Sequence, residues 1–165
     1  MPKWLTTSLF LLAFLLTTPI FAQEVGEQAP DFSAITLDNQ PVWLSKDYVG
    51  KKPVLLVFWA TWCPNCFKEI PKLKLLVHHF GNRFPLFAIN IAIKDSLKKT
   101  RAFREKQGLN YPVIFDDGSY ITSAYRVWGT PTLIIVGVNG DILYRASHTP
   151  TIQDINEHWA ELTAK

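Results

Sequence analysis

The chain has 165 residues, of which 48% are hydrophobic and 19% are charged. This length and composition predict one globular domain with a sizeable core and argue against a disordered chain. The formal net charge of +3 is small and scattered along the sequence, so we expect no nucleic-acid partner. The sequence contains only two cysteines, and it has no internal repeat or low-complexity segment.

The first 22 residues predict a targeting segment. Lys3 is the only charged residue of this segment, and an apolar run at residues 9–16 follows it. Pro19 and the small residue Ala22 come next, which suits cleavage of a signal peptide after Ala22. The pattern of a positive start, an apolar centre and a small residue at the cut is typical of exported proteins.

The same segment also suits a retained membrane anchor. Residues 4–23 carry no charge, and their number is close to the roughly 20 residues that a membrane-spanning helix needs. A cleaved signal peptide and an anchor over residues 1–22 therefore both stay open. In either case we expect the domain at residues 23–165 to be exported, to the periplasm or the outer face of the cytoplasmic membrane of a bacterium.

The first half of this domain predicts a hairpin, a central strand and a long helix. Residues 32–37 and 41–44 alternate around a polar turn, which predicts a β-hairpin. Residues 54–59 are apolar throughout, which is typical of a strand covered on both faces. A helical pattern follows at residues 64–80, and we expect Pro71 to kink this helix.

The second half continues the alternation of strands and helices. Residues 84–93 predict a second buried strand, and a polar helix capped by Asp95 or Ser96 should run through residue 107. The remaining predictions are a strand at 113–115, a short helix at 120–127, strands at 133–136 and 141–145, and a last helix at 151–162. Together these elements indicate an α/β fold with a mixed sheet covered on both faces.

The two cysteines, Cys63 and Cys66, lie where the central strand gives way to the long helix. A Cys-x-x-Cys pair at such a junction predicts a redox dithiol. Unpaired backbone N–H groups and the helix dipole favour a thiolate at the helix start, so we expect Cys63 to be the nucleophile. Cys66, one turn later, can resolve a mixed disulfide on Cys63. Pro64 suits the first helical position.

Three other roles for the cysteine pair fit less well. A structural disulfide over so short a loop would restrict the unfolded chain little. A zinc site needs two more ligands, and the nearest histidines, His78 and His79, lie roughly 18 Å further along the same helix. We therefore expect no metal site. Two buried inert cysteines would not suit the polar Asn65 between them.

Four motifs along the chain share one resemblance. They are Ala29-Pro30-Asp31-Phe32, Phe58-Trp59-Ala60-Thr61-Trp62-Cys63-Pro64-Asn65-Cys66, Glu69 with Pro71, and Gly129-Thr130-Pro131-Thr132. From about Gly26 onward, the chain resembles the thioredoxin superfamily, and closely its exported TlpA/ResA/CcmG-like branch. The resemblance implies a thioredoxin-like fold, here with an extra N-terminal hairpin. It also implies that the protein has no cofactor besides a redox-active disulfide between Cys63 and Cys66.

The resemblance also implies where client proteins bind. It implies a cis peptide bond at Thr130-Pro131 that faces the dithiol, in a loop that pairs with an extended client chain and keeps metals off the cysteines. Trp62 and this loop shape the docking surface. We expect the client-binding residues to be Trp62, Pro64, Asn65, Thr130 and Pro131.

Glu69 matches a glutamate that members of the family use near the dithiol. It lies three residues after Cys66 and shares its helix face. A partly buried carboxylate there would have a raised pKa and would relay the proton that Cys66 loses or gains. The alternative is a solvated glutamate in the first turns of the helix. Many thioredoxins carry a buried aspartate where this chain has Val57, and its absence places more weight on Glu69.

These observations predict an exported thiol–disulfide oxidoreductase that reduces or exchanges disulfides in client proteins. Asn65 is neutral where the strongly oxidising DsbA proteins carry a histidine, so we expect a milder couple. The resemblance suggests clients in cytochrome c maturation or copper-site assembly, a DsbD-type membrane electron donor, and a monomeric enzyme. A DsbA-like oxidant and a Cu(I)-handling dithiol module remain the alternatives.

Overall fold

The computed structural model describes residues 25–165. The signal peptide or anchor predicted at residues 1–22 lies outside this range. Within the described residues, no helix has both the length and the apolar character that a membrane crossing requires.

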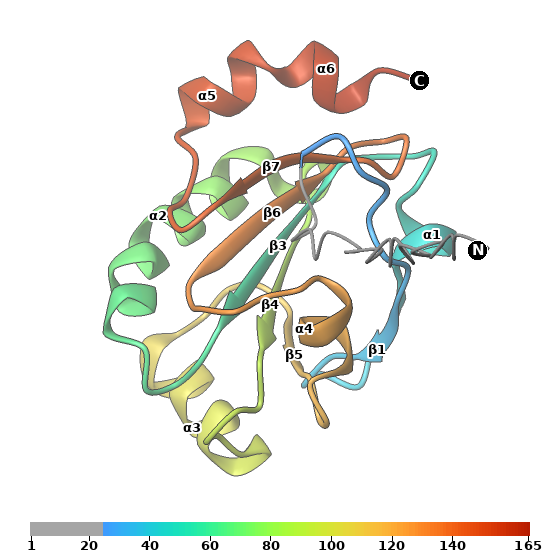
Figure 1. The fold of residues 1–165 in the computed structure, drawn as a ribbon. Helices are drawn as coiled ribbons and strands as arrows, with labels where there is room; N and C mark the ends of the chain where they lie inside the picture. Colours follow the sequence, from blue (N-terminus) through green and yellow to red (C-terminus); the bar gives the residue numbers. More distant parts are fainter. Residues whose placement is uncertain (1–24) are drawn as a thin grey trace, which may run out of the picture.

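A five-stranded mixed sheet forms the centre of the domain (Figure 1), with the strand order β5-β4-β3-β6-β7. The strands are β3 (Val54–Trp59), β4 (Leu86–Asn90), β5 (Val113–Phe115), β6 (Thr132–Val136) and β7 (Ile142–Ala146). Strand β3 pairs parallel with β4 and antiparallel with β6. Every residue of β3 is buried, as its unbroken apolar run predicts. The sheet confirms the predicted α/β class and its mixed strand directions.

Helices lie on both sides of this sheet. They are α1 (Leu44–Asp47), α2 (Pro64–Phe80), α3 (Leu97–Gln107), α4 (Tyr120–Ala124), α5 (Ile152–Glu157) and α6 (Trp159–Thr163). Trp59 of β3 packs at a tilt against Phe103 of α3, whereas its neighbour Phe58 contacts Tyr125 at the end of α4. Successive side chains of a strand point to opposite faces, so α3 and α4 cover opposite faces of the sheet.

Strand β4, helix α4 and the last predicted helix differ in extent from the sequence prediction. Strand β4 ends at Asn90 because the Asn90 side chain accepts a hydrogen bond from the backbone N–H of Ala92 and turns the chain away. The short helix α4 stops at Ala124. The predicted last helix is divided at His158, whose ring Nδ1 lies 2.8 Å from the carbonyl oxygen of Asp154. Such local side-chain bonds compete with regular helix.

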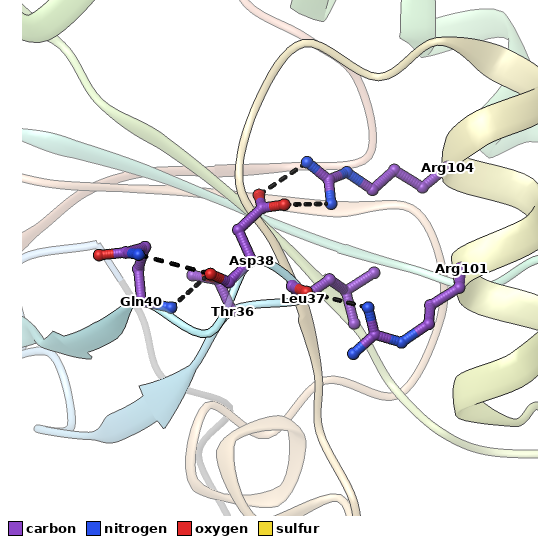
Figure 2. A network of polar contacts seen from close by, with 6 residues as sticks. All are labelled: Thr36, Leu37, Asp38, Gln40, Arg101 and Arg104. Atoms are coloured by element: carbon purple, nitrogen blue, oxygen red, sulfur yellow. Dashed lines mark hydrogen bonds and ion pairs between the residues drawn. The ribbon is translucent and has the colours of Figure 1, made fainter.

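The predicted N-terminal hairpin is present as a separate two-stranded antiparallel sheet, β1 (Ser33–Ile35) and β2 (Pro41–Trp43). Its turn is bound to α3 (Figure 2). Both terminal nitrogens of Arg104 donate to the carboxylate of Asp38 at 2.7 Å, and Arg101 donates to the carbonyl oxygen of Leu37. These contacts hold the hairpin beside the helix that flanks the active-site edge of the sheet.

Candidate active site

Cys63 caps the N-terminus of the 17-residue helix α2 and forms a disulfide with Cys66. The backbone N–H of Cys66 lies 3.1 Å from the sulfur of Cys63 and donates to it. Pro64 begins the helix, where its missing N–H costs no hydrogen bond. Once the disulfide is reduced, this N–H and the positive end of the helix dipole stabilise a thiolate on Cys63.

The two cysteines are buried, but the residues around them reach solvent. Cys63 and Cys66 expose 2% and 5% of their surface, whereas Pro64 and Asn65 between them are exposed. Trp62 exposes 48% of its surface, and its indole N–H donates to the carbonyl oxygen of Ile93 at 2.8 Å. The Trp62 ring is therefore fixed at one edge and open to a partner on its remaining surface.

The Thr130-Pro131 peptide bond is cis, as the resemblance implied. Pro131 is buried and lines a cavity of about 20 Å³ together with Cys66 and Glu69. Val57 and Trp59 of the central strand complete the wall nearest the sheet. The structure thus brings Cys66, Glu69 and Pro131 together around one narrow cavity. Trp62, Pro64 and Asn65 are exposed to solvent.

Glu69 is buried, and two groups hold its carboxylate. The backbone N–H of Thr149 donates to Oε2 at 2.7 Å, and the ammonium of Lys72 lies 3.0 Å from Oε1. Burial raises the pKa of Glu69, but the hydrogen bonds from Thr149 and Lys72 outweigh burial and bring the pKa below its ordinary value. The expectation of a raised pKa is wrong, and so is the alternative of a solvated side chain.

Val57 occupies the strand position where many thioredoxins carry a buried aspartate, and it is fully enclosed. Glu69 is accordingly the acidic residue that lines the cavity beneath the disulfide. Trp59 lines the same cavity, and no described residue offers an acceptor to its buried indole N–H. Within residues 25–165 no cluster of three or more His, Cys, Asp or Glu side chains is placed to hold a metal ion.

Asp95 is a site residue that the sequence suggested only as a helix cap. Its carboxylate accepts hydrogen bonds from the backbone N–H and the hydroxyl of Thr61, at 2.8 and 2.9 Å. It also accepts from the Asn90 amide and the Ser96 N–H, each within 2.9 Å. Burial raises the pKa of Asp95, but these four donors lower it below its ordinary value. Asp95 therefore ties the loop before Cys63 to the end of β4.

This fold and site define a class of protein. A redox-active disulfide at a helix N-terminus, on a mixed sheet and next to a cis-proline loop, is the arrangement of a thioredoxin-fold thiol–disulfide oxidoreductase. The chain is an enzyme of this class, and comparisons with known proteins agree.

Residues 25–145 match the AhpC/TSA family, and the chain belongs to this family. It is 38% identical to the thioredoxin-like protein YneN of Bacillus subtilis over 118 residues, which cover 71% of this chain and 68% of that protein. It is 32% identical to the thiol-disulfide oxidoreductase ResA of Geobacillus kaustophilus over 153 residues, covering 89% of this chain and 85% of ResA.

Solved structures give the same result. A candidate protein disulfide isomerase from Bacteroides thetaiotaomicron has a TM-score of 0.72 and 29% identity, covering 85% of this chain and 96% of that one. A candidate thiol:disulfide interchange protein DsbE from Chlorobium tepidum has a TM-score of 0.70 and 27% identity, covering 85% and 99%. These similarities confirm the thioredoxin-like fold and the ResA and DsbE resemblance.

Proposed function

We propose that this enzyme reduces or exchanges disulfides in exported client proteins. The observation that carries the proposal is the position of Cys63 at the start of α2, next to the exposed Trp62 and the neutral Asn65. The helix start favours the thiolate that attacks a client disulfide. No cationic side chain lies between the two cysteines to stabilise that thiolate so strongly that the couple becomes a strong oxidant.

The proposed reaction is a two-step exchange. The thiolate of Cys63 attacks one sulfur of the client disulfide, a mixed disulfide forms, and the other client sulfur leaves as a thiolate. Cys66 then loses its proton and attacks the sulfur of Cys63, which closes the enzyme disulfide and releases the second client thiolate. Two electrons pass from the enzyme to the client, whose thiolates take up protons from solvent.

We propose that Glu69 accepts the proton of Cys66 in the second step. It is a carboxylate at neutral pH, because its pKa lies below the ordinary value, and it lines the same narrow cavity as Cys66. A carboxylate is an acceptor, so this arrangement supports removal of the proton that Cys66 must lose. Trp62, Pro64, Asn65, Thr130 and Pro131 form the surrounding client-binding surface in this proposal.

The proposed setting is the periplasm or the outer face of the cytoplasmic membrane. The apolar N-terminal segment supports export, as a cleaved signal peptide or as an anchor. Outside the cytosol a dithiol is oxidised unless a partner reduces it, so the proposal includes a membrane electron donor of DsbD type. Apocytochromes c and copper-site assembly proteins are the clients we propose.

The direct test is a trapping experiment with Cys66→Ser in the native cell envelope. Without the resolving thiol, mixed disulfides between Cys63 and its clients should accumulate and can be identified by mass spectrometry after non-reducing electrophoresis. A matched Cys63→Ser variant should trap nothing. Recovery of no client-sized adduct with either variant would contradict the proposal.

Two alternative functions have distinct measurable signatures. A DsbA-like oxidant would equilibrate with glutathione at a potential near −120 mV, whereas we expect a clearly lower potential. A Cu(I)-handling module would bind one Cu(I) tightly to the reduced dithiol. The burial of both cysteines beneath the Pro131 loop argues against easy access for a metal ion.

A further inference from the structure

We infer that a rigid, cationic ledge beside the disulfide selects client segments that carry acidic residues. The docking ledge consists of Trp62 together with residues 93–99. This inference rests on the proposed function, because it names the chemistry of the proteins that the dithiol acts on.

The docking ledge lies directly against the redox centre. The indole of Trp62, the residue before Cys63, donates to the carbonyl oxygen of Ile93. The backbone N–H of Ile91 donates to the carbonyl oxygen of Trp59, so the ledge segment leaves β4 beside the end of β3. A client chain that docks across Trp62 to reach Cys63 therefore lies next to this segment.

The docking ledge is rigid. Ala92 and Lys94 both adopt positive φ angles, of 60° and 53°, which non-glycine residues hold only where the surroundings impose them. The surroundings here are the four hydrogen bonds that Asp95 accepts from Thr61, Asn90 and Ser96. Because the segment is already ordered, a client that docks on it loses little free energy to loop ordering.

The outward surface of the docking ledge is apolar and positively charged. Ile93 and Leu97 expose 48% and 44% of their surface, next to the equally exposed Trp62. Three exposed cations lie among these apolar side chains, namely Lys94, Lys98 and Lys99. Asp95 is the only acidic residue in the sequence from 91 to 104, and both of its oxygens accept hydrogen bonds within the protein.

Helix stability does not explain these charges. Lys98 and Lys99 occupy the first turn of α3, which contains no acidic residue, and cations there face the unfavourable end of the helix dipole. The exposed acid Asp117 lines a groove with Leu97 of the ledge, but the cation Arg101 lines the same groove. The net charge along the ledge is thus positive, and it complements a client segment with Asp or Glu flanking an apolar residue.

The test uses the pre-reduced protein in single turnovers with three cystine peptides of equal length. Their flanking residues are acidic, neutral or lysine, and the second-order rate constant of disulfide reduction is measured. We expect the acidic peptide to react fastest and the lysine peptide slowest, with the difference shrinking as salt is added. Equal rates for the acidic and lysine peptides, while the neutral peptide is reduced, would overturn the inference and leave the proposed function intact. Reduction of none of the three would contradict the proposed function itself.

A matched pair of variants locates the effect. Lys98→Gln/Lys99→Gln should lower the ratio of acidic to lysine-peptide rates by about threefold to tenfold, because charges at the rim of a docking site act mainly on association. Lys51→Gln/Lys52→Gln removes the same charge just before β3, at the end of that strand opposite to Cys63, and should change the ratio little. An equal fall of this ratio in both variants would mean that net charge alone is responsible, and it would contradict a role of the docking ledge. Even if a variant folds poorly, the three-peptide comparison with the unaltered protein still tests whether charge selects the clients.

Discussion

The two sulfurs of the disulfide lie in different surroundings. On the side of Cys63, the exposed Trp62 and the polar contacts of Asp95 form an open surface next to a helix N-terminus. On the side of Cys66, a narrow cavity of about 20 Å³ is lined mostly by apolar side chains and by a single acidic residue, Glu69. The first side suits contact with a large partner, whereas the second excludes it.

The difference separates the two steps of the proposed reaction in space. Attack on a client needs an accessible thiolate, and Cys63 is the cysteine next to the exposed surface. Resolution needs a proton to leave Cys66 while a client still covers the surface, and the cavity behind Cys66 provides an acceptor in Glu69. The two carboxylates differ in the same way. Asp95 accepts hydrogen bonds from neutral donors and fixes the loop before Cys63, whereas Glu69 lines the cavity beside Cys66.

The largest expected effect separates the two cysteines directly. Cys63→Ser should abolish both turnover and adduct formation, because it removes the attacking sulfur. Cys66→Ser should also reduce turnover to background, but it should form a mixed disulfide with a model cystine peptide at nearly the unaltered rate. Intact-mass spectrometry of stopped reactions checks both results. An adduct on Cys66 in the Cys63→Ser variant would show that the two sides are not distinct.

Asp95→Asn should weaken the hydrogen bonds that hold the loop before Cys63 on the exposed side of the site. The amide keeps one acceptor oxygen but places an NH₂ against donors, so at least one buried N–H or hydroxyl loses its acceptor at a cost of about 1–3 kcal/mol. We expect a fall of this size in the free energy of unfolding from urea denaturation. We also expect a change in Trp62 fluorescence, taken as the part of the tryptophan emission that a Trp62→Phe replacement removes.

Asp116→Asn is the matched control for this variant. Asp116 is also buried, and it accepts hydrogen bonds from Ile121 and Thr122 of α4. Its carboxylate accepts no hydrogen bond from the loop that precedes Cys63. The control should lose similar stability and keep the Trp62 signal and the rate of attack by Cys63. If both variants change the Trp62 signal alike, Asp95 has no particular role in positioning that ring.

Glu69→Gln should lower the rate at which Cys66 resolves the mixed disulfide by about tenfold or more, because general bases typically contribute at least that much to proton removal. The loss should appear in the release of the client from its mixed disulfide and not in the attack by Cys63. Rapid-quench measurement of both steps separates them. Equal slowing of attack and release would mean that Glu69 affects the whole site and not Cys66 in particular.

The pH dependence of stability gives a smaller and independent measure of Glu69. Its pKa in the folded state lies below the ordinary value of 4.5, so the folded protein binds this proton more weakly than the unfolded chain does. The stabilisation is complete above that ordinary value and is lost as the pH falls through the folded pKa. The stability difference between the unaltered protein and Glu69→Gln should therefore stay constant from about pH 6 to 8 and shrink in acid. A difference that grows as the pH falls would reverse the assigned pKa direction.

Local sequence patterns predicted much of this architecture. The unbroken apolar run of β3, the helix from Pro64 and the position of the dithiol all follow from short-range periodicity and spacing, and the cis Pro131 followed from the family motif. The contacts that adjust the site join distant segments. Thr61 and Asp95 are separated by 34 positions, and Glu69 and Thr149 by 80.

These distant contacts explain the error in the pKa of Glu69. Helical spacing places its carboxylate on the helix face of Cys66 but leaves open whether it is buried or solvated, and burial alone raises a carboxyl pKa. The hydrogen bonds that reverse the shift come partly from the segment between β7 and α5, which no local pattern aligns with α2. Likewise, Asp95 has the ordinary signature of a helix cap, and only the folded chain places Thr61 against it.

Thr149 presents a donor from the peptide backbone to Glu69, at 2.7 Å from Oε2. Any replacement at position 149 that preserves the local fold keeps this donor, with the exception of proline, which lacks an N–H. The part of the lowered Glu69 pKa that comes from this backbone donor is therefore kept when the side chain at position 149 changes, whereas the part that comes from the Thr149 side chain is not. Thr149→Pro is therefore the replacement that would most change the pKa of Glu69, and with it the resolving step, without altering either sulfur.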